Sequence, residues 1–323
     1  MEITVKNAIL HIMNNAGDSV LSKSELDIDS EVCHDFIVKH VKKLLSNNAA
    51  KEATFNADSP VCGLIRQFQE DKLRFTPMAT AIGEHLQGIM QKHPAIPAGD
   101  LLIAFCDIKG PHMAILKLHY KECMTHQVRG QQSQLVKYEA VLPDKVEEAC
   151  LIPFDPMLLR VIEKPLEIDG EMVSYFSALF LGCEASLSKK EAVQIISDVT
   201  EEINERFFSG SPKMEALVKA ALVDEAEEAE GVVSLEKVAA KAFEGRQEIQ
   251  QEYLALAREA GLVADYPMGE KLAKQSFGVQ KIKCENGIEI SIPTYLMDDE
   301  DAVAFELNDD GTSRLVIKRV QRA

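Results

Sequence analysis

The feature that most constrains this chain is a change of character within residues 175–194, YFSALFLGCEASLSKKEAVQ. A short apolar run ends at Gly182, and the segment from Ser188 to Glu191 then has the form of a capping box at a helix start. Apolar residues recur at helical spacing beyond it: Ala192, Ile195, Ile196, Val199, Ile203 and Phe207. We therefore expect a domain boundary here, with one domain over residues 1–178 and a second over 179–323.

The N-terminal part has a mixed pattern of strands and helices. A helix is expected from a cap at Asp29 or Ser30 to about Ser46. Further helices are predicted at 60–69 and 77–92, and strands at 3–13, 19–26, 101–107, 113–122, 135–142 and 149–153. Short turns between these strands favour antiparallel neighbours. The predicted fold class is α+β, with a mixed antiparallel sheet-and-helix domain first.

The C-terminal part is expected to be helical and then β-rich. Acidic helices are predicted over residues 188–260, as segments 188–208, 212–228, 234–243 and 246–260, and β hairpins over 279–320. A three-residue loop ending at Gly287, with that glycine in the left-handed conformation, keeps apolar and charged residues on separate faces. That register gives the pairs Cys284 with Ile288, Ile282 with Ile290 and Lys283 with Glu289. For the next hairpin, the expected pairs are Val303 with Ile317, Phe305 with Leu315 and Glu306 with Arg314.

The charge is strongly negative and unevenly distributed. The formal net charge is −17; residues 1–178 carry 18 basic and 24 acidic groups, and residues 179–266 carry 9 and 18. Long-range electrostatics therefore repel polyanions, so nucleic-acid contact requires a local basic patch or an oligomeric groove. The seven cysteines are odd in number and never in CxxC spacing, which favours reduced thiols in the cytoplasm. No signal peptide or membrane-spanning run is seen, so no membrane partner is predicted.

Familiar catalytic patterns are missing from the sequence. Neither GxxxxGK[ST] nor GxGxxG occurs, and there is no GxSxG or HExxH. His34 beside Cys33 is the one close Cys/His pair, and adjacent helical positions point in different directions. The prediction is a protein with no catalytic residues, cofactor or metal site, and no enzymatic activity. One alternative stays open: a metal-dependent nuclease that uses the acid run 298–301.

Two groups of basic residues are candidates for contacting a phosphate backbone. On the 30–46 helix, Lys39, Lys42 and Lys43 cluster on one side, with Asp35 placed to neutralise part of the charge of Lys39. The C-terminal tail carries basic groups and no acids: Lys318, Arg319 and Arg322.

The junction also carries a family resemblance. Tyr175-Phe176, then Phe180-Leu181-Gly182 with Glu184, followed by a polar stretch and a long helix, resembles the bacterial nucleoid-associated protein family of the YejK or NdpA type. The segment 100–106, DLLIAFC, is similar as well, and so are residues 272–277 and the hairpin at 286–292. The order of these segments matches over nearly the whole chain.

The resemblance implies a cytoplasmic protein located on the nucleoid, which binds double-stranded DNA without enzymatic activity. With the acidic charge, DNA would be bound through local basic patches, and a homodimer would join patches from two subunits. The alternative is an acidic protein-interaction adaptor for DNA-processing machinery such as a type II topoisomerase. In that role Glu225, Glu227 and Glu228 would bind a basic partner.

Overall fold

The computed structural model divides into two compact units, Met1–Ser188 and Lys189–Ala323, which are described separately. The structure describes residues 2–15, 19–130, 132–283, 287–297, 299, 301–307 and 313–318. The expected boundary followed residue 178, whereas the first unit extends to Ser188. The reason is that β11 (Cys183–Ala185) pairs with β2 (Lys51–Phe55) in the first unit's sheet.

The first unit is built on a seven-stranded antiparallel sheet with the strand order β1-β3-β4-β7-β8-β2-β11. The remaining strands of this sheet are β1 (Thr4–Met13), β3 (Gly99–Asp107), β4 (Pro111–His119), β7 (Glu148–Pro153) and β8 (Leu158–Ile162). The central strands β3 and β4 are buried along most of their length, so each face of the sheet must be covered by helices.

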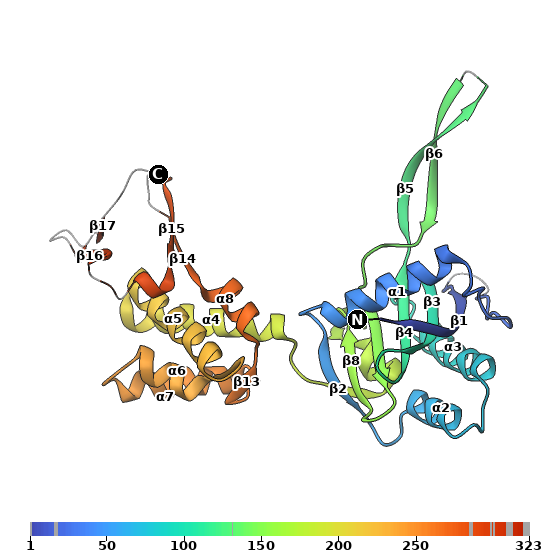
Figure 1. Ribbon diagram of the computed structural model, residues 1–323, viewed down its shortest axis with the longest axis horizontal. Coiled ribbons are helices and arrows are strands. Elements are labelled where there is room, and N and C mark those ends of the chain that lie inside the picture. Colours follow the sequence, from blue (N-terminus) through green and yellow to red (C-terminus); the bar gives the residue numbers. More distant parts are fainter. Residues whose placement is uncertain are drawn as a thin grey trace. The chain divides into compact units, whose positions relative to one another are not determined.

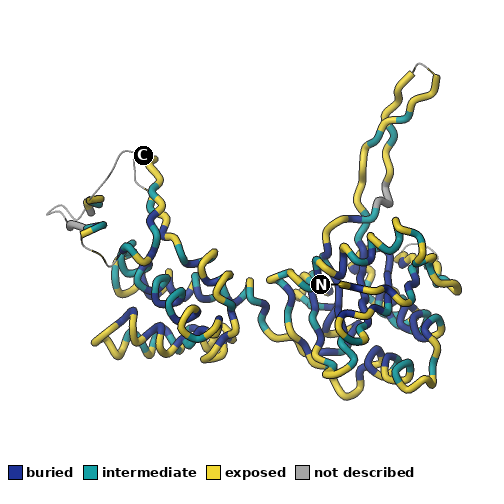
Figure 2. The backbone as a smooth tube through the Cα atoms, viewed as in Figure 1, coloured by how far each residue is buried: buried dark blue, intermediate teal, exposed yellow. Residues whose placement is uncertain are grey.

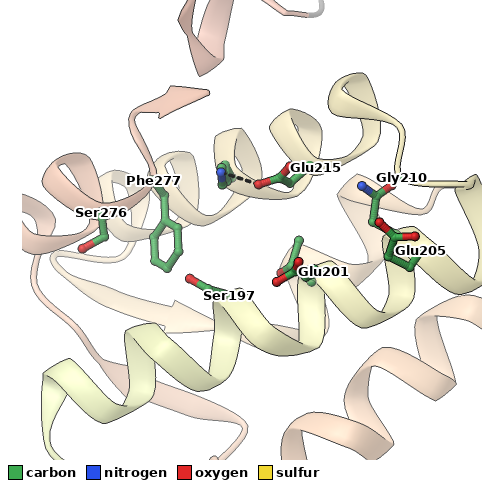
Figure 3. A pocket seen from close by; sticks show the side chains of 10 residues that line it. Ser197, Glu201, Glu205, Gly210, Glu215, Ser276 and Phe277 are labelled. Atoms are coloured by element: carbon green, nitrogen blue, oxygen red, sulfur yellow. Dashed lines mark hydrogen bonds and ion pairs between the residues drawn. The ribbon is translucent and has the colours of Figure 1, made fainter. Parts of the chain in front are cut away.

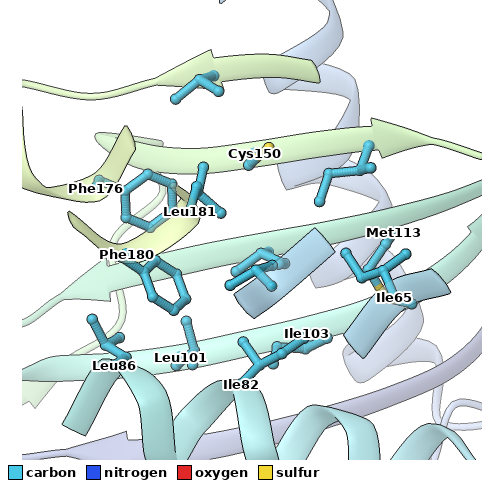
Figure 4. Packing of buried hydrophobic residues seen from close by; sticks show 14 of the residues in the cluster. Ile65, Ile82, Leu86, Leu101, Ile103, Met113, Cys150, Phe176, Phe180 and Leu181 are labelled. Atoms are coloured by element: carbon cyan, nitrogen blue, oxygen red, sulfur yellow. The ribbon is translucent and has the colours of Figure 1, made fainter. Parts of the chain in front are cut away.

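Helices cover both faces and create two apolar cores (Figures 1 and 2). Helix α1 (Glu31–Ser46) packs on one face, over alternate strand residues such as Leu102 and Leu116. The opposite face carries α2 (Pro60–Gln69) and α3 (Phe75–Lys92). Figure 4 shows Ile82 and Leu86 of α3 packed toward Leu101 and Ile103 of β3. Successive residues of a strand point to opposite faces of the sheet, so each central strand contributes side chains to both cores.

The apolar run at the junction forms a π-helix rather than a strand. This helix, η1 (Phe176–Leu181), buries Phe176, Phe180 and Leu181 in the core below the α2–α3 face. It ends at Gly182, whose φ of 62° is left-handed. A Cβ there would lie 3.2 Å from the Cβ of Ser59, so glycine meets both a conformational and a packing requirement.

A long two-stranded ribbon leaves the first unit beyond β4. Its strands, β5 (Lys121–Arg129) and β6 (Gln132–Val141), pair only with each other among the described residues. Figure 1 shows this ribbon extending away from the sheet. The sequence pattern predicted a strand at 135–142, which covers most of β6, and one at 113–122, which is mainly β4. It did not predict the rest of β5, since the residues of that strand are mainly polar. Two short strands, β9 (Leu166–Ile168) and β10 (Glu171–Val173), complete the unit.

The second unit begins with the predicted helices. These are α4 (Lys189–Phe208), α5 (Pro212–Glu228), α6 (Leu235–Ala242) and α7 (Gln247–Glu259), followed by α8 (Glu270–Phe277), which was not predicted. The Ser211 hydroxyl accepts a hydrogen bond from the Met214 amide, as its position before Pro212 indicates. Short strands β12 (Val232–Ser234) and β13 (Asp265–Pro267) pair beside the helices, and η2 (Thr294–Leu296) is a 3₁₀ turn.

Both predicted hairpin registers are confirmed. Strands β14 (Val279–Lys283) and β15 (Glu289–Pro293) pair Ile282 with Ile290 and Lys283 with Glu289, and Gly287 has a φ of 85°. Cys284 lies outside the described residues. Strands β16 (Val303–Leu307) and β17 (Ser313–Ile317) show the other predicted register, with the pairs Val303 with Ile317, Phe305 with Leu315 and Glu306 with Arg314.

Two local predictions are wrong. Residues 19–26 do not form a strand; a single bridge joins Val20 to Ile12, with hydrogen bonds of 2.9 and 2.8 Å. Phe207, expected on the buried face of α4, is exposed, and its ring lies 5.3 Å from the guanidinium carbon of Arg206. Thr200 and Asn204 are buried on the stripe that carries Ile196 and Ile203, whereas Phe207 lies in the last turn of α4.

Candidate nucleic-acid interface

The three predicted lysines lie on the C-terminal half of α1. Lys39 Nζ is 2.7 Å from Asp144 Oδ1, and Lys43 Nζ donates to the backbone carbonyl of Asp144. Lys42 is exposed. The expected pairing of Lys39 with Asp35 is wrong, since the lysine reaches a loop that is remote in sequence.

The buried His40 side chain holds that loop against the helix. Its Nδ1 lies 2.8 Å from the Phe36 carbonyl and its Nε2 lies 2.9 Å from the Pro143 carbonyl. Because Pro143 immediately precedes Asp144, this contact fixes the acidic group between the two lysines. Hydrogen bonds from Lys39 keep the pKa of Asp144 below its ordinary value, so the loop remains charged.

The same loop brings two further lysines to this surface. Lys145 Nζ and Lys164 Nζ lie 2.8 and 3.0 Å from Glu147 Oε1. Hydrogen bonds from Lys145 and Lys164 lower the pKa of Glu147 to about 2. Four lysines therefore contact Asp144 or Glu147, and exposed Lys42 lies on α1 between Lys39 and Lys43 in the sequence. We call this set the lysine surface: Lys39, Lys42, Lys43, Lys145 and Lys164.

Sequence analysis found only the part of the lysine surface that lies on α1. Lys145 and Lys164 were missed because Lys145 stands in an otherwise acidic segment, DKVEE, and Lys164 is far away in the chain. A search for lysines close in sequence to a carboxylate would have found Lys145, two residues before Glu147. Nothing in the sequence around Lys164 indicates that it reaches the same carboxylate.

The C-terminal candidates are not brought to the lysine surface by any described contact. Lys318 is exposed and its amide donates to the Ala302 carbonyl at 2.9 Å, at the end of β17. Arg319 and Arg322 lie outside the described residues. The tail therefore remains a separate candidate in the second unit.

A buried polar network lies at the foot of the ribbon. Lys117 and Glu148 are cross-strand partners on β4 and β7, with Nζ and Oε2 4.0 Å apart. Glu148 Oε2 also lies 2.9 Å from His119 Nε2 and accepts a hydrogen bond from the Tyr175 hydroxyl. Lys117 Nζ donates to the Pro97 carbonyl at 2.6 Å. Desolvation lowers the pKa of Lys117 to about 8, although Glu148 opposes that shift.

Ion pairs within the second unit occupy most of the acidic run at 224–230. Asp224 pairs with Lys241, Glu225 with Lys237 at 2.8 Å and Glu227 with Lys274 at 2.6 Å. Glu225 is also buried. These carboxylates support the packing of α5 against α6 and α8, which leaves less of their charge for a partner than the sequence alone indicated.

An acceptor-rich pocket of about 280 Å³ lies elsewhere in the second unit. Figure 3 shows Ser197, Glu201 and Glu205 along α4, with Glu215 on α5 across from them. Glu215 is engaged by Lys219, whose Nζ is 2.6 Å away. The carboxylates on α4 therefore give this pocket its negative charge.

Two classes of feature are absent from the described residues, a metal-binding cluster and a membrane-spanning helix. In that part of the chain, no three histidine, cysteine, aspartate or glutamate side chains lie close enough together to hold a metal ion. The acid run 298–301 falls partly outside it. Of the helices the structure describes, none has the length and apolar character needed to cross a membrane.

Comparisons with known proteins match this chain to nucleoid-associated proteins. The family model described as nucleoid-associated protein YejK matches residues 9–323. A nucleoid-associated protein of Photobacterium profundum, PBPRA2585, is 29% identical over 109 residues, which is 32% of this chain and 32% of that relative. The alignment thus spans about a third of the relative's length, while the family model spans nearly all of this chain. The chain belongs to the family of the nucleoid-associated protein YejK.

Proposed function

We propose that this protein binds double-stranded DNA on the nucleoid, in the cytoplasm, and has no enzymatic activity. The observation that carries the proposal is the lysine surface. Lys39 contacts the Asp144 carboxylate and Lys43 the Asp144 backbone carbonyl, while Lys145 and Lys164 share the Glu147 carboxylate. Exposed Lys42 adds a further charge. A local excess of positive charge is what a strongly acidic chain needs in order to approach a phosphate backbone. Family membership supports the same role.

The arrangement suits phosphate binding rather than sequence reading. Lysine side chains are point charges on flexible stems, which position a protein on DNA without identifying bases. Asp144 and Glu147 hold the lysines in place and remain negatively charged, so the surface would bind weakly as a single copy. We propose that a homodimer presents two such surfaces to one duplex and gains affinity through that multivalency.

Salt-dependent binding to a short labelled duplex tests this function. The variant K42Q/K145Q/K164Q removes three charges from the lysine surface and spares Lys39 and Lys43, which contact Asp144. The matched control, K271Q/K281Q/K283Q, makes the same change in net charge within the second unit. We expect only the first variant to weaken binding and to reduce the log–log salt slope by roughly 0.9 for each lost phosphate contact.

Two outcomes contradict the proposal. Absence of duplex binding by the wild-type protein at low ionic strength would overturn DNA recognition. Equal weakening by the two triple variants would show that net charge, and not the lysine surface, controls binding. Sedimentation of the wild-type protein measures the homodimer separately, and a monomer at the concentrations used for DNA binding contradicts that part.

A second candidate function is an adaptor for DNA-processing machinery such as a type II topoisomerase. The observation in its favour is the acceptor-rich pocket, where Glu201 and Glu205 can accept hydrogen bonds from a lysine or arginine side chain of a partner. A pull-down with a purified topoisomerase would compare E201Q/E205Q with the control E248Q/E259Q on α7. Equal binding of the partner by both variants would rule this pocket out.

A further inference from the structure

The ribbon formed by β5 and β6 has two chemically different faces. Residues directly opposite each other in an antiparallel pair point to the same side. The pairs Gln127–Gln134 and Arg129–Gln132 therefore share one face at the outer end of the ribbon, and Thr125–Val136 and Cys123–Tyr138 continue that face toward the base. We call this the glutamine face. The alternate pairs place the exposed apolar residues Met124, Val128 and Leu135 on the other side, opposite Lys137, Ser133 and His126 respectively. We call this the apolar face after its three exposed apolar side chains.

The ribbon also differs from the rest of the chain in charge. From Cys123 to Tyr138 the sequence contains no aspartate or glutamate, although the whole chain carries 52 acidic residues and a net charge of −17. Of the basic residues in this segment, Arg129 lies on the glutamine face, whereas His126 and Lys137 lie on the other face. Lys137 pairs with Glu122, whose Oε1 is 2.6 Å from its Nζ. The segment is thus a projecting surface that does not repel a polyanion, in a protein whose average surface does.

The dimensions of the ribbon favour one groove of DNA. Two paired strands lie about 4.8 Å apart, so a two-stranded ribbon is narrow. The major groove of B-form DNA is about 12 Å wide and admits a two-stranded ribbon, while the minor groove is only about 6 Å wide. The nine residues of β5 extend about 30 Å at roughly 3.3 Å per residue, which is enough to cross a groove.

Glutamine is suited to the edges of bases that the major groove exposes. Its side-chain amide donates and accepts together, which matches adenine, and arginine matches guanine. Gln132, Gln134 and Arg129 are exposed on the glutamine face. No base of the duplex would have to unstack for these side chains to reach it.

The base of the ribbon is held firmly enough to present this face. Strand β4 ends at His119, which contacts Glu148 at the start of β7, and the Tyr120 hydroxyl donates to Asp100 Oδ1 at 2.5 Å. The chain that returns from β6 to β7 carries Asp144 and Glu147, around which the lysine surface is built. Phosphate-binding lysines thus lie next to the foot of the ribbon in the same unit.

We propose that the glutamine face of the β5–β6 ribbon lies in the major groove of duplex DNA while the lysine surface contacts the adjacent phosphates. The inference rests on the proposed function and adds the element that enters the duplex, the groove that receives it and the side chains that touch the bases. The apolar face, with Met124, Val128 and Leu135, points out of the groove in this arrangement.

The test compares two neighbouring cross-strand pairs that lie on opposite faces. Q127A/Q134A alters the glutamine face, and V128A/S133A alters the other face one register position away; neither changes the charge. We expect Q127A/Q134A to weaken binding of the full-length protein to a short labelled duplex roughly tenfold, because bidentate base contacts are lost. Its salt slope should remain that of the wild type, since no phosphate contact is removed. V128A/S133A should bind as the wild type does.

Groove-specific competitors provide a second measurement on the unmodified protein. Methyl green, which occupies the major groove, should displace the protein from the duplex, and netropsin, which occupies the minor groove, should not. Circular dichroism of both variants checks that the fold is intact. Wild-type affinity in Q127A/Q134A, or displacement by netropsin alone, would overturn the inference.

The result also separates this inference from the proposed function. If the wild-type protein binds DNA and the lysine variant is weakened but Q127A/Q134A is not, only the ribbon assignment fails. If the wild-type protein binds no duplex, both fail. If V128A/S133A changes the sedimenting mass while Q127A/Q134A leaves DNA affinity unchanged, the ribbon is a protein contact, and the groove assignment is overturned.

Discussion

Lys117 and Glu148 face each other across β4 and β7, both buried, with Nζ and Oε2 4.0 Å apart. His119 and Tyr175 also contact the Glu148 carboxylate. A buried ion pair contributes little net stability when intact, yet loss of one partner leaves an uncompensated charge in the interior. The pair also lies near the ends of β4 and β7 between which the ribbon leaves the sheet.

Replacement of Glu148 by glutamine should therefore destabilise the protein strongly. We expect a loss of about 3–5 kcal/mol in the free energy of unfolding, measured with urea, because Lys117 loses its buried counter-charge. The double variant K117M/E148Q, which removes both charges, should be less destabilised than E148Q alone. Equal stability of E148Q and the wild type would contradict the assigned role of the pair.

The lowered pKa of Lys117 should also make the free energy of unfolding depend on pH in the alkaline range. Its pKa is about 8 in the folded protein against 10.5 for an ordinary lysine. Between these values the unfolded chain holds a proton that folded Lys117 lacks, so stability should rise as the pH increases from about 8. Urea unfolding of K117M from pH 7.5 to 9.5 should lack this rise. If the free energy of unfolding changes with pH in the same way for K117M and the wild type, Lys117 is not the source of the rise.

His11 predicts a loss of stability on the acid side. Its Nε2 donates to the Ala79 carbonyl at 3.1 Å and its Nδ1 accepts from the Ser22 amide at 3.0 Å, an arrangement that requires the neutral ring. Burial lowers the pKa of His11 below the ordinary value of 6.5. Below that pH the unfolded chain gains the proton first, so stability should be full above about pH 6.5 and fall beneath it.

Thermal unfolding from pH 7.5 to 5 measures the effect of His11. H11Q should lower the melting temperature at neutral pH and flatten its decline toward pH 5. His85 also has a pKa lowered by burial, so some decline should remain in H11Q. An H11Q curve as steep as that of the wild type would exclude His11 as a source of the dependence.

Gly182 should not tolerate alanine. Its φ of 62° and the 3.2 Å that would separate an added Cβ from Ser59 Cβ both oppose a side chain. We expect G182A to lower the free energy of unfolding by about 1–2 kcal/mol, the cost of a left-handed alanine, or more. The control G63A lies within α2, where a Cβ meets nothing within 4 Å, and should be neutral or stabilising.

The basic tail predicts a change in salt dependence rather than in stability. A form ending before Lys318 removes three basic side chains, Lys318, Arg319 and Arg322. If each contacts a phosphate, the log–log slope of duplex binding should fall by roughly 2.7, at 0.9 for each contact. Urea unfolding should be nearly unchanged. A slope equal to that of the full-length protein would remove the tail from the DNA interface.

Local sequence patterns predicted much of the secondary structure. Helix α2 has the predicted bounds, and α1, α4 and α5 lie within a residue of theirs. Both C-terminal hairpin registers were predicted because side-chain alternation links residues that are close in the chain. The β5–β6 ribbon was only partly predicted, since its polar residues have no buried face and therefore no alternation of apolar and polar residues.

In the candidate interface, too, features within one element were predicted and contacts between distant segments were not. The three lysines on α1 were found because they lie within one helix. Their partner, Asp144, is 105 residues from Lys39 in the chain, and the contact depends on how α1 packs against the sheet. The acidic run is a second example. Lysines on α6 and α8 pair with Asp224, Glu225 and Glu227, so these carboxylates have partners within the chain that the sequence did not indicate.

The sequence by itself determined the α+β class, the main helices, the hairpin registers, the acidic charge and the family resemblance. These depend on composition and on periodicity over a few residues. Only the tertiary structure decided that β11 joins the first sheet, and that lysines from α1 and from two distant segments contact Asp144 and Glu147. It also decided that a ribbon whose outer part, from Cys123 to Tyr138, has no acidic residue projects from the same unit. The physical reason is that packing brings together groups far apart in the chain, and no local pattern encodes which of them will meet.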